Sequence, residues 1–233
     1  MLRLILNADD FGYDPAVSRG IAEAMRQGVV SSTTMIVNSP WSEEAGAQAG
    51  GLAIGLHLNL VRFASVSQPS VELTERGHHD LQFIVKETRA QLERLKKLTG
   101  RPATHIDVHK HAHRDPAVLA ALGIVAREAS LAVRSIDAAM RQDLRDAGVR
   151  TNDAFFGEAG DEAFWTSQSW AQTLDQLPRE GVIELMCHPG YRPSHVVSGY
   201  GSQRELELAT FLSPATREAL VSRGLTLSSW AGV

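Results

Sequence analysis

The sequence has little cysteine, no block of basic residues and no long apolar run. Cys187 is the only cysteine among 233 residues, which excludes an intramolecular disulfide and favours a reducing compartment. No stretch approaches the roughly 18 consecutive apolar residues of a membrane-spanning helix. Lysine and arginine are dispersed and the formal net charge is −4, which argues against a nucleic-acid-binding or anionic-membrane surface.

The N-terminal residues also lack the pattern of a signal peptide, because the apolar stretch after Met1 is short and acidic residues follow at once. We therefore expect a cytoplasmic protein that neither inserts into a membrane nor binds nucleic acid. With 43% hydrophobic and 21% charged residues, the chain can bury a sizeable core. Its length predicts one domain over residues 1–233.

Segments typical of strands alternate with segments typical of helices along most of the chain. We expect strands over 2–7, 29–38, 52–60, 103–111, 131–136, 181–190 and 225–230. We expect helices over 15–28, 42–50, 80–100, 115–129, 167–177 and 202–212, one helix with irregular chain in 137–164, and a loop over 61–79. The alternation predicts an α/β fold with parallel strands, and about seven units favour an irregular TIM-like (β/α) barrel.

Polar residues that could act in catalysis or bind a metal follow or end four of the predicted strands. Asp9 and Asp10 follow the first strand, His57 and His109 lie late in the third and fourth, and His188 lies near the end of 181–190. Parallel α/β sheets and barrels place their active sites at the C-terminal ends of the strands. We therefore interpret these five residues as parts of one site.

Each of these residues has a simpler interpretation in isolation. An Asp-Asp pair is more often a solvated turn or a helix cap, and a histidine in an apolar strand is more often a satisfied core residue. His188, before Pro-Gly, is equally well a turn residue. Their expected position at one end of the sheet favours a catalytic site over these separate interpretations. One carboxylate and two histidines suit a catalytic metal, and a second carboxylate and a third histidine could act as base and acid. That set predicts a metal-dependent hydrolase of an amide or ester.

The segment THIDVHKHAH, residues 104–113, contains four of the nine histidines. In a regular strand, His105, Asp107, His109, His111 and His113 would share one face, but the row would span about 26 Å and could not converge on one ion. A histidine-rich loop without a site is the alternative. We expect His105 to be structural, and Asp107 to accept the second ring N–H of a metal-binding His109.

Six motifs in order along the chain resemble the YdjC-like carbohydrate deacetylases, which include chito-oligosaccharide deacetylases and a hopanoid-biosynthesis-associated branch. The motifs are LILNADDFG, GVVSSTTMIVN, AIGLHLNL, RPATHIDVHKHAH, IELMCHPGY and RELELATFL. The segment between His57 and His105 is shorter than is typical of that family, and residues 137–164 match nothing in it. Both segments are expected to shape the sugar-binding cleft.

The resemblance implies an irregular TIM-like barrel that carries one divalent metal ion, magnesium or zinc, and that forms a homodimer. Carried over motif by motif, the roles are metal ligand for Asp10, His57 and His109, general base for Asp9, general acid for His188, and substrate contact for His111 and His113. The implied reaction is removal of N-acetyl groups from an acetylated amino sugar or oligosaccharide.

Two other functions remain open from the sequence. A glycoside hydrolase on a related barrel needs two carboxylates about 5–9 Å apart on either side of the bond, which adjacent Asp9 and Asp10 fit poorly. A non-catalytic sugar-binding or metal-storage protein would not need the base and acid that accompany the predicted metal ligands.

Overall fold

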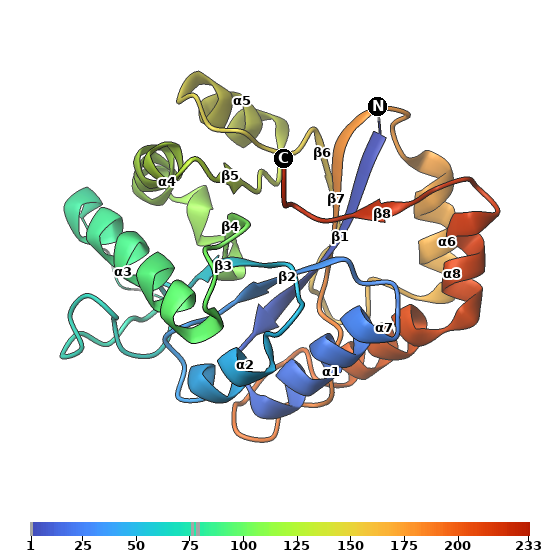
Figure 1. The fold of residues 1–233 in the computed structure, drawn as a ribbon, viewed down its shortest axis with the longest axis horizontal. Helices are drawn as coiled ribbons and strands as arrows, with labels where there is room; N and C mark the ends of the chain where they lie inside the picture. The colour runs from blue at the N-terminus through green and yellow to red at the C-terminus, as the bar shows by residue number, and fades with distance from the viewer. Residues whose placement is uncertain (1, 76, 78–79) are drawn as a thin grey trace.

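The strands of the protein form one parallel sheet that curls into an incomplete barrel, with helices packed on its outside (Figure 1). The computed structural model describes residues 2–75, 77 and 80–233. The strands are β1 (Leu2–Phe11), β2 (Ser32–Met35), β3 (Ile54–Leu58), β4 (His105–Val108), β5 (Ala132–Val133), β6 (Ala154–Phe156), β7 (Gly181–Cys187) and β8 (Leu227–Ser228). Their order is β5-β4-β3-β2-β1-β7-β6, and β8 pairs with β1. The predicted irregular TIM-like barrel is confirmed.

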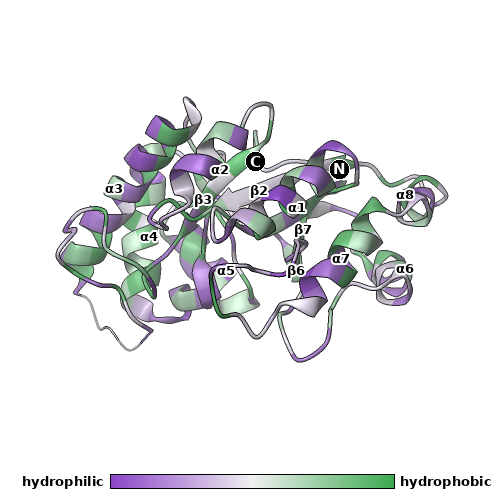
Figure 2. Ribbon diagram, turned by 90° about the horizontal axis from the view of Figure 1, so that it is seen from below, coloured by the Kyte–Doolittle hydropathy of each residue, from purple (hydrophilic) through white to green (hydrophobic). Residues whose placement is uncertain are grey.

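The helices follow the strands in the alternation expected of crossover units. They are α1 (Pro15–Arg26), α2 (Ser42–Gln48), α3 (Leu81–Thr99), α4 (Pro116–Ala129), α5 (Ala138–Asp146), α6 (Ser167–Gln176), α7 (Ser202–Leu212) and α8 (Pro214–Val221), with a 3₁₀ segment at His109–Arg114. Hydrophilic and hydrophobic residues alternate along α1, α3 and α7 (Figure 2), as in helices that bury one face. No helix in this described part of the chain is long and apolar enough to cross a membrane.

β1 is the centre of the sheet because its apolar run can be covered on both faces. It pairs with β7 from Leu2 to Ala8, with β8 at Leu4 and Ile5, and with β2 from Asn7 onward. β8 and β2 therefore pair with the same edge of β1, β8 nearer its N-terminal end and β2 nearer its C-terminal end. The path of the sheet ends at β5 on one side and β6 on the other, so the barrel is open between these two strands.

Local sequence signals set most of the helix ends. Asp14 and Asp115 accept hydrogen bonds from the backbone N–H groups two residues ahead, each before a proline at the first helical position. Asp80 caps α3 by accepting from the backbone N–H of Phe83, three residues ahead. Gly100 ends α3 with a φ of 72°, which costs a glycine little.

The structure differs from the predicted elements in four places. The strand expected over 103–111 ends at Val108, because Lys110 and His111 take left-handed φ values of 54° and 50°. Residues 137–164 hold α5 as expected, and also β6, whose three half-buried residues are too few to show a period. α8 was not expected. Within the predicted loop 61–79, Ala64 and Glu72 form a β-bridge, and residues 76 and 78–79 lie outside the described part.

Candidate active site

The end of β1 turns both of its acidic residues into the barrel mouth. Adjacent residues of a regular strand point to opposite faces. The register of β1 with β2 shifts between Ala8 and Phe11, and Asp10 has a φ of 75°, a left-handed conformation that costs a non-glycine residue about 1–3 kcal/mol. Both Asp9 and Asp10 consequently line one cavity. Strain of this kind persists where the surrounding contacts hold it.

Three side chains from three strands bring their donor atoms together at the barrel mouth. Asp10 Oδ1 lies 3.3 Å from His57 Nε2 and 3.0 Å from His109 Nδ1. The two histidine nitrogens are 3.2 Å apart. Ligands about 2.1 Å from one ion lie about 3.0 Å apart at octahedral angles and about 3.4 Å apart at tetrahedral angles. The triangle therefore fits a small divalent cation, and the three residues predicted as ligands are the ones that form it.

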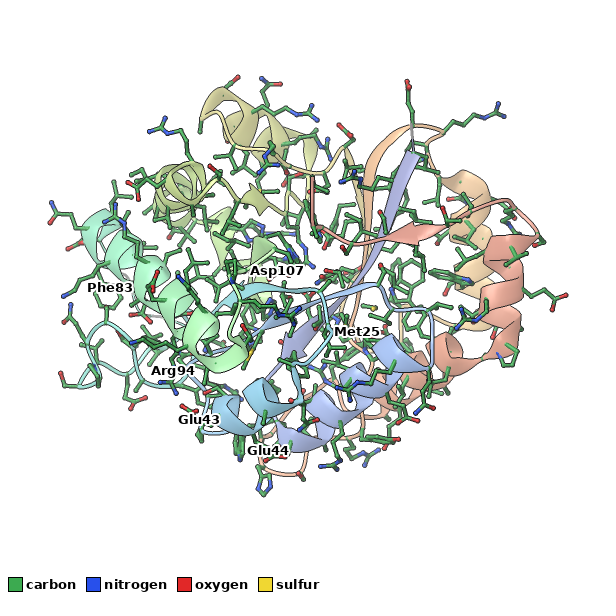
Figure 3. All side chains as sticks on the ribbon, in the orientation of Figure 1. Met25, Glu43, Glu44, Phe83, Arg94 and Asp107 are labelled. Carbon is green, nitrogen blue, oxygen red and sulfur yellow. The ribbon has the colours of Figure 1, made fainter. Side chains whose placement is uncertain are left out.

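Asp107 orients His57 rather than His109, contrary to expectation. Its Oδ1 lies 2.6 Å from His57 Nδ1, and its Oδ2 accepts from Thr34 Oγ1 at 2.9 Å. Because Asp107 takes Nδ1–H, Nε2 of His57 is left to face Asp10 and His109, the usual division of an imidazole at a metal. Figure 3 shows Asp107 in the interior of the molecule, whereas Arg94 and Glu43 lie near α2 and α3 on the outside. β4 ends at Val108 and the 3₁₀ segment begins at His109, so His109 does not continue the strand alternation that would place it on the same face as Asp107.

The carboxylates around His57 change its ionisation. Burial opposes a charged imidazole, but Asp107 and Asp10 outweigh burial and raise the pKa of His57 to about 10. Burial lowers the pKa of His109, although Asp10 acts in the opposite direction. A metal ion bound at Nε2 of His57 would displace the proton there, so binding of the ion and release of a proton are linked.

Arg134 joins the acidic residues behind the triangle into one buried network. Its guanidinium donates to both oxygens of Asp9 at 2.6 and 2.7 Å, to Glu184 at 2.7 Å and lies 2.8 Å from Asp107. The side chain is fully buried. Burial by itself would raise the pKa of Asp9, but Arg134 outweighs it and holds that pKa well below the usual range. Asp9, His57 and Asp107 also lie close together, but the buried cation Arg134 already binds both of these carboxylates, which makes the group a poor metal site.

Loss of Arg134 should destabilise the fold strongly. In Arg134→Met the carboxylates of Asp9, Asp107 and Glu184 lose their common buried cation, and we expect the free energy of unfolding to fall by about 3–5 kcal/mol. Urea denaturation followed by circular dichroism measures it. The control is Arg145→Met, since Arg145 pairs with Asp153 on the surface and should cost below about 1 kcal/mol. Equal losses in the two variants would show that the network does not stabilise the fold.

His188 directly follows β7 and lines the same cavity as the triangle. Its backbone N–H donates to Glu207 Oε2 at 2.6 Å, and its ring packs edge-on against Tyr200 at 5.4 Å. Burial lowers its pKa to about 4, although Asp10 and Asp9 act in the opposite direction. Cys187, the preceding residue, is buried and donates to Asn7 O, in agreement with its interpretation as a small core residue.

The other histidines of the 104–113 segment separate into different environments. His111 lines the cavity, as expected for a substrate contact. His113 does not: it is fully buried, is absent from the cavity lining, and lies 5.8 Å from the His111 ring. The prediction that His113 faces the cleft was wrong, because the 3₁₀ turn at His109–Arg114 replaces the alternation of a strand. His105 stacks on Trp230 at 4.8 Å in the core, consistent with a structural role.

Three residues of the site were not predicted. Arg204 on α7 donates to Asp10 Oδ2 at 2.5 Å, which leaves Oδ1 for the triangle. Glu207, one turn later, accepts from His188 N and Tyr200 Oη, and burial raises its pKa to about 7. Arg134 is the third. Two features of the sequence could have indicated these residues. One is the arginine inside the apolar strand segment LAVRSI, and the other is the set of charged residues in the helical segment RELELATFL.

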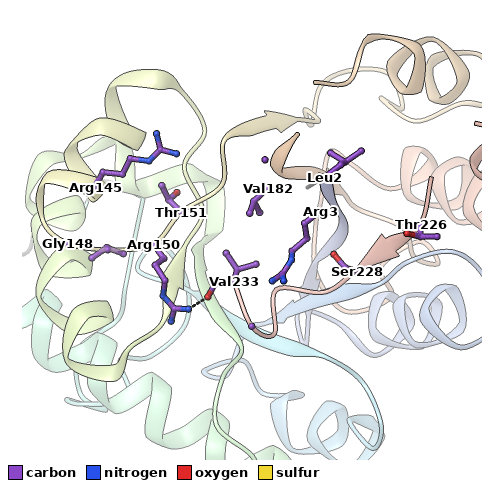
Figure 4. Close-up of a pocket in the computed structure, with 13 residues that line it drawn as sticks. Leu2, Arg3, Arg145, Gly148, Arg150, Thr151, Val182, Thr226, Ser228 and Val233 are labelled. Atoms are coloured by element: carbon purple, nitrogen blue, oxygen red, sulfur yellow. Dashed lines mark hydrogen bonds between the residues drawn. The ribbon is translucent and has the colours of Figure 1, made fainter. Parts of the chain in front are cut away.

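The cavity around these residues has a volume of about 740 Å³, within the range of ligand-binding sites. A second cavity of about 750 Å³ lies at the opposite, N-terminal ends of β1 and β7 (Figure 4). Arg3, Arg145 and Arg150 line it, and among the described residues its lining contains no histidine, aspartate or glutamate. The cavity at the strand C-terminal ends is therefore the candidate active site.

The chain is similar to known proteins over nearly its whole length. The chitooligosaccharide deacetylases of Yersinia pestis and Yersinia pseudotuberculosis are 34% identical over 97% of both chains. A crystal structure of an Enterococcus faecalis protein described as acting in cellobiose-phosphate cleavage superposes with a TM-score of 0.82, at 30% identity, over 98% of this chain and 97% of that one. A family 4 acetyl xylan esterase of Clostridium thermocellum, solved with a cobalt ion, shares the fold at a TM-score of 0.54 and 12% identity, over 98% and 88% of the two chains.

The sequence model of the YdjC-like proteins matches residues 3–222, nearly the whole chain. The resemblance seen in the sequence motifs is thereby confirmed. By this match, and by its similarity to the deacetylases over almost their full length, the chain belongs to the YdjC-like family.

Proposed function

We propose that the protein is a metal-dependent hydrolase that removes N-acetyl groups from an amino sugar or its oligosaccharides. The observation that carries the proposal is the triangle of Asp10, His57 and His109, which lies in one cavity with Asp9 and His188. The family and the names of the Yersinia relatives favour a carbohydrate deacetylase. The identity of the ion, magnesium or zinc, is part of the proposal.

A divalent ion held by the triangle would lower the pKa of a water molecule and polarise the acetyl carbonyl. The other groups act through this chain's own atoms. Asp9 is kept ionised by Arg134, and its carboxylate retains lone pairs with which to take the proton of the attacking water. His188 is neutral at pH 7, so the proton that it gives to the leaving amine is one that the attacking water has released. Arg204 holds the second oxygen of Asp10 and so fixes the orientation of that carboxylate.

The contacts of the acidic pair disfavour a glycoside hydrolase. Both oxygens of Asp9 bind Arg134, and the oxygens of Asp10 are divided between Arg204 and the two histidines. Asp10 is therefore not free to act as the second carboxylate that cleavage of a glycosidic bond requires. A non-catalytic sugar-binding protein would have no use for Asp9 and His188 beside the triangle. Homodimer formation and a cytoplasmic location stay predictions.

Removal of metal should abolish the reaction. We expect the metal-loaded protein to release acetate from N-acetylglucosamine oligomers and the protein treated with a chelator to release none, with recovery when zinc or magnesium is returned. Acetate is measured by a coupled assay, and bound metal by elemental analysis. The substrates tested include a phosphorylated disaccharide, because the Enterococcus faecalis relative is described as acting in cellobiose-phosphate cleavage. Both acetate and free sugar are measured for that substrate. Failure to release acetate from every N-acetyl sugar, with metal bound, would contradict the proposal.

A further inference from the structure

The irregular segment between β7 and α7 forms one wall of the candidate active site. Residues 197–200 line the cavity together with His111 of the 3₁₀ turn. Val197 on this wall is 92% exposed, whereas Asp10, His57 and His109 are buried. The wall therefore reaches from the catalytic floor to the outer rim. Apolar side chains with a few placed polar groups are what small-molecule sites use for binding.

One buried carboxylate holds this segment in place. Asp14 Oδ2 accepts from the backbone N–H groups of Ser194 at 3.1 Å and His195 at 2.8 Å. Asp14 Oδ1 meanwhile caps α1 through Ala16 N at 2.8 Å. The side chain is fully buried, so these donors satisfy a charge that water does not reach.

Two further contacts hold the same segment against the neighbouring elements. The His195 ring stacks on Trp41 with centroids 5.4 Å apart, just before α2. Gly20 of α1 packs so closely on Gly190 that an added Cβ would lie 2.6 Å from Gly190 Cα. The segment is thus held at its start by α1 and near its middle by Asp14 and Trp41, and residues 197–200 extend beyond those contacts to the cavity.

We propose that Asp14 is a positioning residue that holds residues 194–195, so that residues 197–200 bind the part of the sugar chain outside the reacting acetamido group. The inference rests on the proposed function for the identity of that ligand. The reacting group must reach the buried triangle, and the exposed rim at Val197 is left to the rest of the oligosaccharide, whose rings present C–H faces to an apolar side chain.

The chain contains a matched control for this role. The sequence Asp-Pro-Ala-Val occurs at residues 14–17 and again at 115–118, and in both places the aspartate caps a helix. Asp115 is exposed, and its carboxylate bonds only Ala117 N among the described contacts. Asparagine is as good an N-cap as aspartate. In Asp14→Asn, however, the amide that replaces one oxygen is a donor and cannot accept from two N–H groups.

The experiment compares Asp14→Asn with Asp115→Asn in the metal-loaded protein. Amide hydrogen exchange over residues 191–200 should be at least about tenfold faster in Asp14→Asn and unchanged in Asp115→Asn. KM for the N-acetylglucosamine disaccharide should rise about tenfold in Asp14→Asn while kcat stays within about threefold, because uniform binding is lost and the chemistry is not. Exchange that is unchanged in Asp14→Asn, or equally faster in both variants, would overturn the proposal. Faster exchange with KM unchanged would also overturn it.

Calorimetric titration with the same disaccharide separates the inference from the proposed reaction. It is run at low temperature for short times, and needs no turnover. If the native protein binds the disaccharide and Asp14→Asn binds it about tenfold more weakly, the wall is supported even when no acetate is released. If the native protein does not bind it, or both variants bind it as tightly as the native protein, the inference fails whatever reaction the site performs.

Discussion

Replacement of His109 by alanine is expected to remove the bound divalent metal and to lower acetate release by at least about a thousandfold. The variant deletes one corner of a triangle whose edges are 3.0–3.3 Å. Two remaining ligands do not define a closed site for zinc or magnesium. His109 is a better test than His57, because His57 also pairs with Asp107 and its loss would disturb the Arg134 network.

Metal content after gel filtration and the initial rate of acetate release measure the effect. The control is His113→Leu, in the same segment. His113 is fully buried, lines no part of the active-site cavity, and has no hydrogen-bond partner for either ring nitrogen among the described residues, so an apolar side chain of similar size can replace it. This variant should keep its metal. A His109→Ala protein that retained one ion per chain would show that the ion binds elsewhere.

The substitution Asp9→Asn should separate metal binding from catalysis. We expect the ion to be retained, because Asp10, His57 and His109 are unchanged, and the turnover number to fall by about 10²–10⁴-fold, because an amide cannot take the proton of the attacking water. Arg134 keeps two of its three carboxylate partners, Asp107 and Glu184, so the fold should survive.

The matched control is Glu184→Gln, which removes one negative charge from the same arginine. Glu184 binds Arg134 at 2.7 Å but does not line the cavity. If the loss in Asp9→Asn came only from disturbance of Arg134, Glu184→Gln would lose as much turnover. A role for Asp9 as the base requires a much smaller loss in Glu184→Gln, with equal metal content in both. Near-native turnover in Asp9→Asn would exclude that role.

Much of the fold follows from short-range patterns. The apolar run at 2–7 predicts the central strand, and Asp-Pro at 14–15 and 115–116 predicts two helix starts that the structure confirms. β6 and α8 were missed because three half-buried residues and a two-turn helix carry too little periodicity. The C-terminal end of the fourth strand was misplaced because nothing local in HKHAH indicates two successive left-handed residues.

For the site, the residue types at the C-terminal ends of the strands suggested one cluster, and the motifs of the family suggested which of them bind the ion. The structure brings Asp10, His57 and His109 together as those motifs imply. His113 could not be excluded from the cleft by its sequence position, since its direction depends on the turn at 109–114.

The sequence by itself determined the class of fold, the order of its elements and the residues available for chemistry, because periodicity, caps and side-chain type are local properties. Only the tertiary structure decided that Arg134 is shared by three carboxylates, that Asp107 orients His57, and that Arg204 and Asp14 reach across the barrel mouth. These contacts join residues that are far apart in the sequence, up to the 194 positions between Asp10 and Arg204. Their distances depend on the curl of the sheet and the bulge in β1, which no local pattern encodes.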